Sequence, residues 1–149
     1  MQAWRPYLQK DIVVLERVQR RATRMIEECK GLEYEDRLRK VGLTTLETRR
    51  VRGDLIEVFK ILNKLENVDE REFFERCRGV DVFTGTSKTR GNDFKLNKQR
   101  VRLDVAKYGF GNRIVDDWNR LPNSVVKEGS LNTFKGKVDK FLRHNRGLI

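Results

Sequence analysis

The strongest constraint on the fold is the stretch 44–65, in which apolar residues cover most of the circumference of a helix. Its apolar members are Leu46, Val51, Leu55, Ile56, Val58, Phe59, Ile61 and Leu62. A helix on the surface shows a single apolar stripe, so this pattern predicts a central helix that other elements surround. Thr44 and Glu47 form a T-x-x-E capping box at its start. Gly53 in its interior lowers helix propensity and indicates close packing against a neighbour.

The stretch 7–28 predicts a second long helix, which is amphipathic and basic. Its apolar residues recur at helical spacing and are expected to face the core: Leu8, Ile12, Leu15, Val18, Ala22, Met25 and Ile26. Four arginines recur at steps of three and four on the opposite side: Arg17, Arg20, Arg21 and Arg24. This helix is therefore expected to present four guanidinium groups outward, and guanidinium groups match phosphate oxygens well.

The remaining elements are shorter. Helical patterns cover roughly 34–41, 69–76 and 112–121, and Ser130 caps a last helix with an apolar stripe that includes Phe134 and Val138. Two alternating runs, 94–97 and 101–105, are separated by a short polar turn and predict a β-hairpin. The expected fold class is mainly α, a helical bundle of about five to six helices with one small β-hairpin.

We expect one domain with three parts. Residues 1–78 form an N-terminal helical subregion, and residues 79–92 form a flexible basic loop that is rich in Gly, Thr and Ser. Residues 93–149 supply the hairpin and the C-terminal helices, which pack on the first part. The start of the chain has no capping residue before Trp4 and is expected to be a cut through a larger protein.

The two halves of the chain differ in net charge. Overall, 33 Lys and Arg oppose 22 Asp and Glu, for a formal net charge of +11. Residues 1–78 hold 18 basic and 15 acidic side chains, a net of +3, whereas residues 79–149 hold 15 basic and 7 acidic, a net of +8. Such an excess favours polyanions, meaning nucleic acid or an acidic membrane surface.

The basic residues of the second half concentrate in and after the predicted loop. They are Lys88, Arg90, Lys95, Lys98, Arg100, Arg102, Lys107 and Arg113, and only Asp93 and Asp104 oppose them. A flexible loop followed by an outward-facing basic ribbon is suited to contact a phosphate backbone. The competing interpretation is a solvated, charge-rich surface. The combined charge favours nucleic-acid contact, without indicating sequence specificity.

Catalytic and metal-binding signatures are missing from the sequence. Asp116 and Asp117 invite comparison with the paired aspartates that hold magnesium in polymerases, but neighbours on a helix diverge by about 100°. Cys29 and Cys77 are too few and too far apart for a zinc site; reduced thiols are expected, with a single disulfide as the alternative. No nucleophile motif, P-loop or dinucleotide fingerprint occurs. We therefore expect no enzymatic activity, no metal, no cofactor and no small-molecule substrate.

The sequence motifs, taken together, resemble the region that follows the polymerase core in non-LTR (LINE-type) retrotransposon reverse transcriptases, with the jockey and chicken-repeat group nearest in pattern. The motifs that carry the resemblance are WRPYL (4–8), DI (11–12), ERVQRRAT (16–23), YEDRL (34–38), GL (42–43), LE (46–47), RR (49–50), GDLI (53–56), TRG (89–91), RIVDDWNRLP (113–122), SLN (130–132) and FK (134–135). They extend over nearly the whole chain. The Cys/His zinc knuckle that some LINE proteins carry is not present in this sequence.

The resemblance implies a non-catalytic accessory domain, located after the thumb, whose palm and endonuclease lie elsewhere in the same polyprotein. Its expected partners are RNA or DNA and the polymerase portion. The alternative is a structural module that docks on the polymerase thumb or on another protein. No apolar run reaches membrane-spanning length. Membrane-surface association is not expected either, because the apolar face of the first helix is assigned to the core and Glu16 and Glu27 interrupt its polar face. The expected location is intracellular: nuclear when the domain acts, and cytoplasmic while element RNA is assembled.

Overall fold

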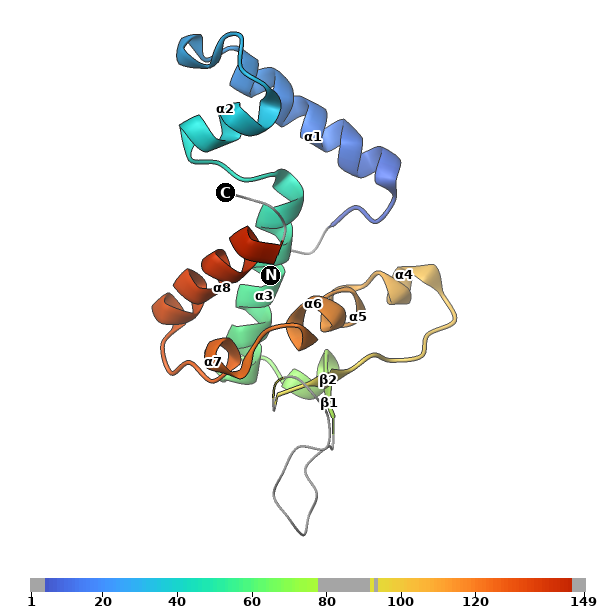
Figure 1. The fold of residues 1–149 in the computed structure, drawn as a ribbon. Coiled ribbons are helices and arrows are strands. Elements are labelled where there is room, and N and C mark those ends of the chain that lie inside the picture. The colour runs from blue at the N-terminus through green and yellow to red at the C-terminus, as the bar shows by residue number, and fades with distance from the viewer. Residues whose placement is uncertain (1–4, 78–91, 93, 146–149) are drawn as a thin grey trace.

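The computed structural model describes residues 5–77, 92 and 94–145 (Figure 1). The described chain is mainly helical, with one two-stranded antiparallel sheet, which confirms the expected fold class. The elements are α1 (Gln9–Arg24), η1 (Glu27–Cys29), α2 (Tyr34–Val41), α3 (Leu46–Leu62), η2 (Glu70–Glu72), β1 (Glu75–Arg76), β2 (Leu96–Asn97), α4 (Asp104–Lys107), α5 (Phe110–Arg113), α6 (Val115–Asn119), α7 (Asn123–Val126) and α8 (Leu131–Asn145).

Helix α3 is the central element, as its apolar circumference predicts. Figure 1 shows α8 lying along it, with α6 and the sheet near its lower end and α1 and α2 beyond its upper end. The ring of Phe59 on α3 stacks on Phe134 of α8, with centroids 4.1 Å apart, and Trp118 of α6 lies against Phe134 as well. The N-cap is Thr45 instead of the expected Thr44, and its hydroxyl accepts a hydrogen bond from the Thr48 amide.

The predicted hairpin is wrong in its pairing. β2 pairs with β1, with Arg76 opposite Leu96, and the segment after β2 forms no strand. Both edges of β2 are occupied: Cys77 N donates to Lys95 O on one side, and the side-chain amide of Asn119 bonds both the N–H and the C=O of Leu96 on the other. No edge remains for residues 101–105, which instead lead into α4 and form its first two residues.

Two predicted helices are shorter than expected. The stretch 69–76 contains only the turn η2 before β1 begins. Phe74 in this stretch is buried, with its ring centroid 5.6 Å from that of Phe110. The stretch 112–121 is divided into α5 and α6 at Ile114. Helix α2 agrees with its pattern and ends at Gly42, whose φ of 68° suits glycine.

Helix α1 forms close to where the sequence predicts, but the predicted burial is wrong for five of the seven apolar residues, since only Ile12 and Leu15 are half-buried. The residues that face the rest of the protein most closely are Gln19 and Thr23, while Val18 and Met25 point into solvent. The reason is a set of hydrogen bonds between α1 and its neighbours, which we call the polar seam. Gln19 forms hydrogen bonds with Tyr34, Thr44 and Arg49. Glu16 accepts a hydrogen bond from the Leu46 amide.

Candidate nucleic-acid interface

A largely exposed stretch from Lys98, just after β2, to Lys107, at the end of α4, carries several of the basic residues that the sequence places there. We call Lys98, Arg100, Arg102 and Lys107 the cationic segment. A buried amide holds it in place: Asn112 accepts from Gln99 N at 2.9 Å and donates to Gln99 O at 3.2 Å and to Ala106 O at 3.4 Å. The hydrogen bonds of Asn112 therefore hold the backbone at Gln99 and Ala106, near the two ends of the segment. The four basic side chains are exposed to solvent.

The four cations of this segment differ in their surroundings. Within the described part of the chain, neither Arg100 nor Arg102 has a hydrogen bond or an ion pair, and both are exposed. Lys98 pairs with Asp116 at the surface. The ammonium of Lys107 lies 5.3 Å from the centroid of the Tyr108 ring. Arg100 and Arg102 are therefore the side chains most available to a phosphate.

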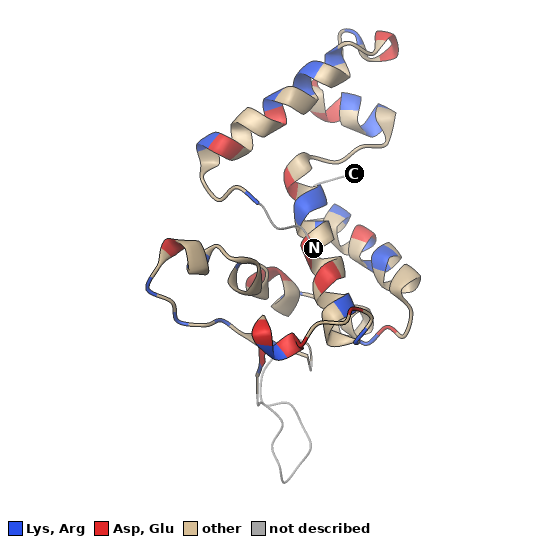
Figure 2. Cartoon of the chain, turned by 180° about the vertical axis from the view of Figure 1, so that it is seen from behind, with Lys and Arg blue, Asp and Glu red and all other residues tan. Residues whose placement is uncertain are grey.

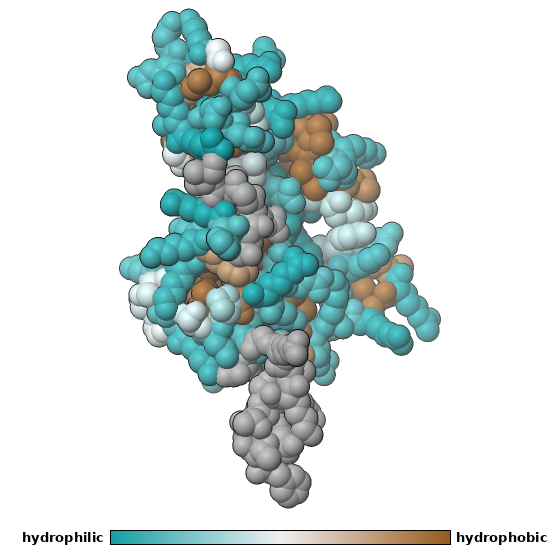
Figure 3. All heavy atoms as spheres, in the orientation of Figure 1, coloured by the Kyte–Doolittle hydropathy of each residue, from teal (hydrophilic) through white to brown (hydrophobic). Residues whose placement is uncertain are grey.

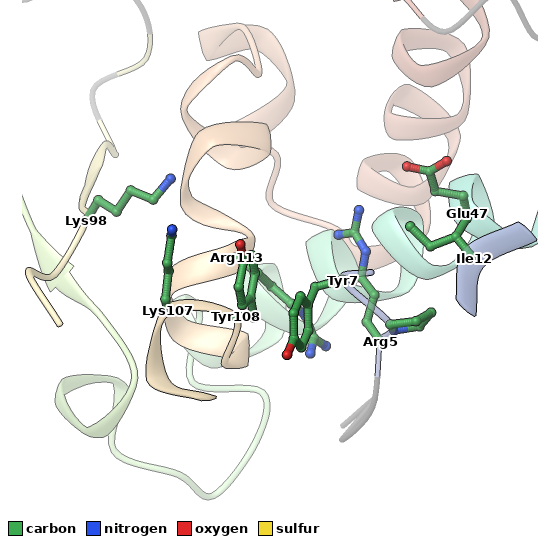
Figure 4. A pocket seen from close by; sticks show the side chains of 9 residues that line it. Arg5, Tyr7, Ile12, Glu47, Lys98, Lys107, Tyr108 and Arg113 are labelled. Atoms are coloured by element: carbon green, nitrogen blue, oxygen red, sulfur yellow. The ribbon is translucent and has the colours of Figure 1, made fainter. Parts of the chain in front are cut away.

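A cavity of about 310 Å³ adjoins the cationic segment (Figure 4). Tyr7 and Tyr108 stack at its wall with ring centroids 4.0 Å apart and planes 4° from parallel. This stack joins the arm before α1 to the turn after α4. The lining residues are Arg5, Pro6, Tyr7, Ile12, Glu47, Lys98, Lys107, Tyr108 and Arg113. Sequence reasoning missed Arg5 and Tyr7, because no linear pattern links them to residues about a hundred positions away.

Arg113 lies in the interior and not on the expected outer surface. Its Nε and one terminal nitrogen donate to the two carboxylate oxygens of Asp54 at 3.0 and 2.9 Å, and the side chains of Arg113 and Asp54 are 9% and 0% exposed. Arg5 Nη1 lies 3.6 Å from the same carboxylate and is buried without a hydrogen bond to any described residue. Arg113 therefore links α5 to α3, which corrects its expected role as an outward phosphate contact.

The arginines of α1 form a second basic surface (Figure 2). Arg17, Arg21 and Arg24 are exposed, and none has a hydrogen bond or ion pair to another described residue. Arg20 differs, since its guanidinium lies 4.6 Å from the centroid of the Tyr34 ring. Burial, together with the hydrogen bond that the Tyr34 hydroxyl donates to Glu16, raises the pKa of that hydroxyl to about 12.

The other expected contacts fall outside these surfaces. Lys95 is partly buried next to the sheet and is engaged in an interaction. Lys88 and Arg90 lie outside the described residues. Figure 2 shows Lys and Arg recurring along α1 and along the connection that leads into α4.

The carboxylates, the thiols and the helix lengths bear on metal binding and on membrane crossing. They contain no group of three or more His, Cys, Asp and Glu side chains that could hold a metal ion. Asp116 pairs with Lys98, while Asp117 lies 3.8 Å from Arg120, so these carboxylates have separate surroundings. Cys29 and Cys77 are free thiols, as expected. None of the described helices combines the length and apolar character needed to cross a membrane.

No protein-family model, curated protein or solved structure matches this chain.

Proposed function

We propose that this chain is a non-catalytic accessory domain that binds RNA or DNA through its cationic segment. The observation that supports this most directly is that Arg100 and Arg102 are exposed and have no partner among the described residues. An arginine that stabilises the fold is engaged as Arg113 is, by a buried carboxylate. Arg100 and Arg102 are exposed on a backbone segment that the hydrogen bonds of Asn112 hold in place, so they are available to an external anion.

The kind of binding follows from the chemistry of the segment. Arginine and lysine bind phosphate through charge and N–H donors, so they position a nucleic acid without reading its bases. The net charge of +11 adds long-range attraction to a polyanion. We expect affinity for RNA and DNA with little sequence preference, and a strong dependence on salt.

The resemblance to LINE-type reverse transcriptases supplies a biological setting for this proposal. In that setting the domain follows the polymerase thumb and holds template RNA, target DNA or their hybrid near the enzyme. It acts beside the polymerase portion of the same polyprotein, and therefore where that polymerase works, in the nucleus. The chain itself is proposed to catalyse no step.

Binding measured against salt tests the proposal. The chain is titrated onto a fluorescent single-stranded RNA, a DNA duplex and a hybrid duplex between 20 and 300 mM salt. On single-stranded RNA, each phosphate contact contributes about 0.7 to the slope of log affinity against log salt. The triple variant Arg100→Gln/Arg102→Gln/Lys107→Gln should therefore reduce that slope by about 2, because three contacts are removed.

A matched variant controls for the overall loss of charge. Lys64→Gln/Arg71→Gln/Lys140→Gln removes three exposed cations, one each from the turn after α3, from η2 and from α8. This variant should keep nearly the parental slope. The proposal fails if the parent shows no binding at 20 mM salt, or if both triple variants lose affinity equally.

A further inference from the structure

Helix α1 leaves one row of its apolar side chains exposed to solvent. Val14, Val18, Ala22 and Met25 follow one another at steps of four, four and three, so they share one side of the helix. We call these four residues the apolar stripe. All four are exposed, and the exposed fractions of Val14, Val18 and Met25 are 54%, 65% and 81%. Figure 3 shows hydrophobic surface over α1 next to hydrophilic side chains.

The polar seam holds the apolar stripe outward. Gln19 Nε2 donates to Thr44 O at 2.9 Å and to the Tyr34 hydroxyl at 3.1 Å, and its Oε1 accepts from Arg49 at 2.9 Å. Arg37 Nε donates to the Thr23 hydroxyl at 3.2 Å, one turn further along. Rotating α1 to bury the apolar stripe would leave these buried polar groups without partners, which is strongly unfavourable. The stripe is therefore an outer surface of this fold.

Positive charge lies along one side of the apolar stripe. Arg17, Arg21 and Arg24 follow one another at steps of four and three, next to the stripe on the helix surface. They are exposed and have no partner among the described residues. A surface that combines apolar side chains at helical spacing with one flanking row of arginines fits an amphipathic helix whose own apolar stripe is flanked by carboxylates.

We propose that the apolar stripe and its arginines dock an acidic amphipathic helix of a partner protein. Val14 and Met25 are 11 positions apart, which corresponds to about 16 Å of helix. The docked helix must therefore present about three turns. A second copy of α1 is a poorer occupant, because it would bring another row of arginines instead of carboxylates. This docking is a second activity beyond the proposed nucleic-acid binding, which remains assigned to the cationic segment.

The direct test uses a synthetic peptide as the probe. An 18-residue fluorescent peptide carries Leu at steps of four, three and four, with Glu along one flank of that stripe. Its binding to the full chain is measured by fluorescence anisotropy at 50 mM salt without nucleic acid. A second peptide, in which every flanking Glu is Gln, should bind about tenfold more weakly or worse if the arginines recognise carboxylates.

Variants of the chain locate the binding surface. Val14→Ser/Val18→Ser/Met25→Ser should weaken binding of the Glu peptide by about tenfold or more, because apolar contacts are lost from the centre of the interface. The fold should persist, since serine and valine have similar helix propensities and all three side chains are exposed. The matched control Leu65→Ser/Leu103→Ser/Val105→Ser changes three exposed apolar residues away from α1 and should bind within about twofold of the parent.

Three outcomes would overturn the docking proposal: equal binding of the Glu and Gln peptides, equal losses in the two triple variants, or no binding of either peptide. A concentration-dependent dimer in sedimentation that Val14→Ser/Val18→Ser/Met25→Ser abolishes would identify a second copy as the occupant instead. RNA binding that falls about tenfold in the same variant would assign the surface to nucleic acid. Because the peptide assay contains no nucleic acid, its failure leaves the proposed function unaffected.

Discussion

Replacing Arg113 by methionine tests whether this arginine has a structural role. The substitution keeps much of the side-chain length but leaves the carboxylate of Asp54, which is wholly buried, without its two hydrogen bonds. Removing one partner of a buried ion pair typically costs about 3–5 kcal/mol, because a buried charge is left uncompensated. Arg5, at 3.6 Å from the same carboxylate, supplies partial compensation. We therefore expect the lower end of that range, about 3 kcal/mol.

Urea denaturation followed by circular dichroism measures this loss. With a slope of about 1.5 kcal/mol per molar urea, a loss of about 3 kcal/mol lowers the midpoint by about 2 M. The double variant Asp54→Asn/Arg113→Met should recover about 1 kcal/mol or more of the loss, since it removes the stranded charge. Arg120→Met is the control: the Arg120 side chain is 73% exposed and 3.8 Å from Asp117, so the expected change is below about 0.5 kcal/mol.

A structural role for Arg113 is ruled out if Arg113→Met costs less than about 1 kcal/mol, or if the double variant is as unstable as the single one. Either result would mean that the Arg113–Asp54 ion pair does not stabilise the packing of α5 against α3, as its burial indicates that it does. A large loss of RNA affinity in Arg113→Met with unchanged stability would restore the sequence-based expectation of a phosphate contact.

Two further predictions concern packing and pH. Gly111→Ala places a Cβ 2.4 Å from the backbone oxygen of Phe73 and should cost about 1–3 kcal/mol in urea denaturation, whereas Gly136→Ala meets no atom within 4 Å and should not destabilise. The Tyr34 pKa of about 12 lies above the ordinary value of 10.0, so its stabilisation is complete below pH 10 and is lost as pH rises toward 12. Tyr34→Phe should lack that component of the alkaline decline, and an identical decline in parent and variant would contradict the assignment.

Local pattern was sufficient for the main helices. The apolar circumference of 44–65 predicts a central helix, and α3 is central because a helix that is apolar nearly all round is stable only when other elements cover it. The apolar residues at helical spacing from Leu131 onward likewise predict α8 and the face by which it packs into the core. In both cases the signal lies within one element and needs no knowledge of the partner.

Strand pairing and the burial of Arg113 depend on residues that are distant in the chain. The alternation at 101–105 is typical of a strand, but Asn119 and β1 already occupy the two edges of β2. Arg113 is one of several basic residues in its segment, and only the tertiary fold brings Asp54, 59 positions earlier, within hydrogen-bonding distance. Composition therefore predicted the basic character of the surface without distinguishing Arg113 from Arg100.

Helix α1 shows the same division between sequence and tertiary structure. The sequence by itself determined a helix near 7–28, of which 9–24 forms α1, and that apolar residues and arginines occupy different sides, because both follow from the helical repeat. Only the tertiary structure decided which side faces inward. The hydrogen bonds that Gln19 forms with Tyr34, Thr44 and Arg49 turn the side that carries Gln19 and Thr23 inward, and they leave both the arginines and the apolar stripe exposed. Burial of a helix face depends on what its neighbours offer, and satisfied polar partners outweighed apolar contact here.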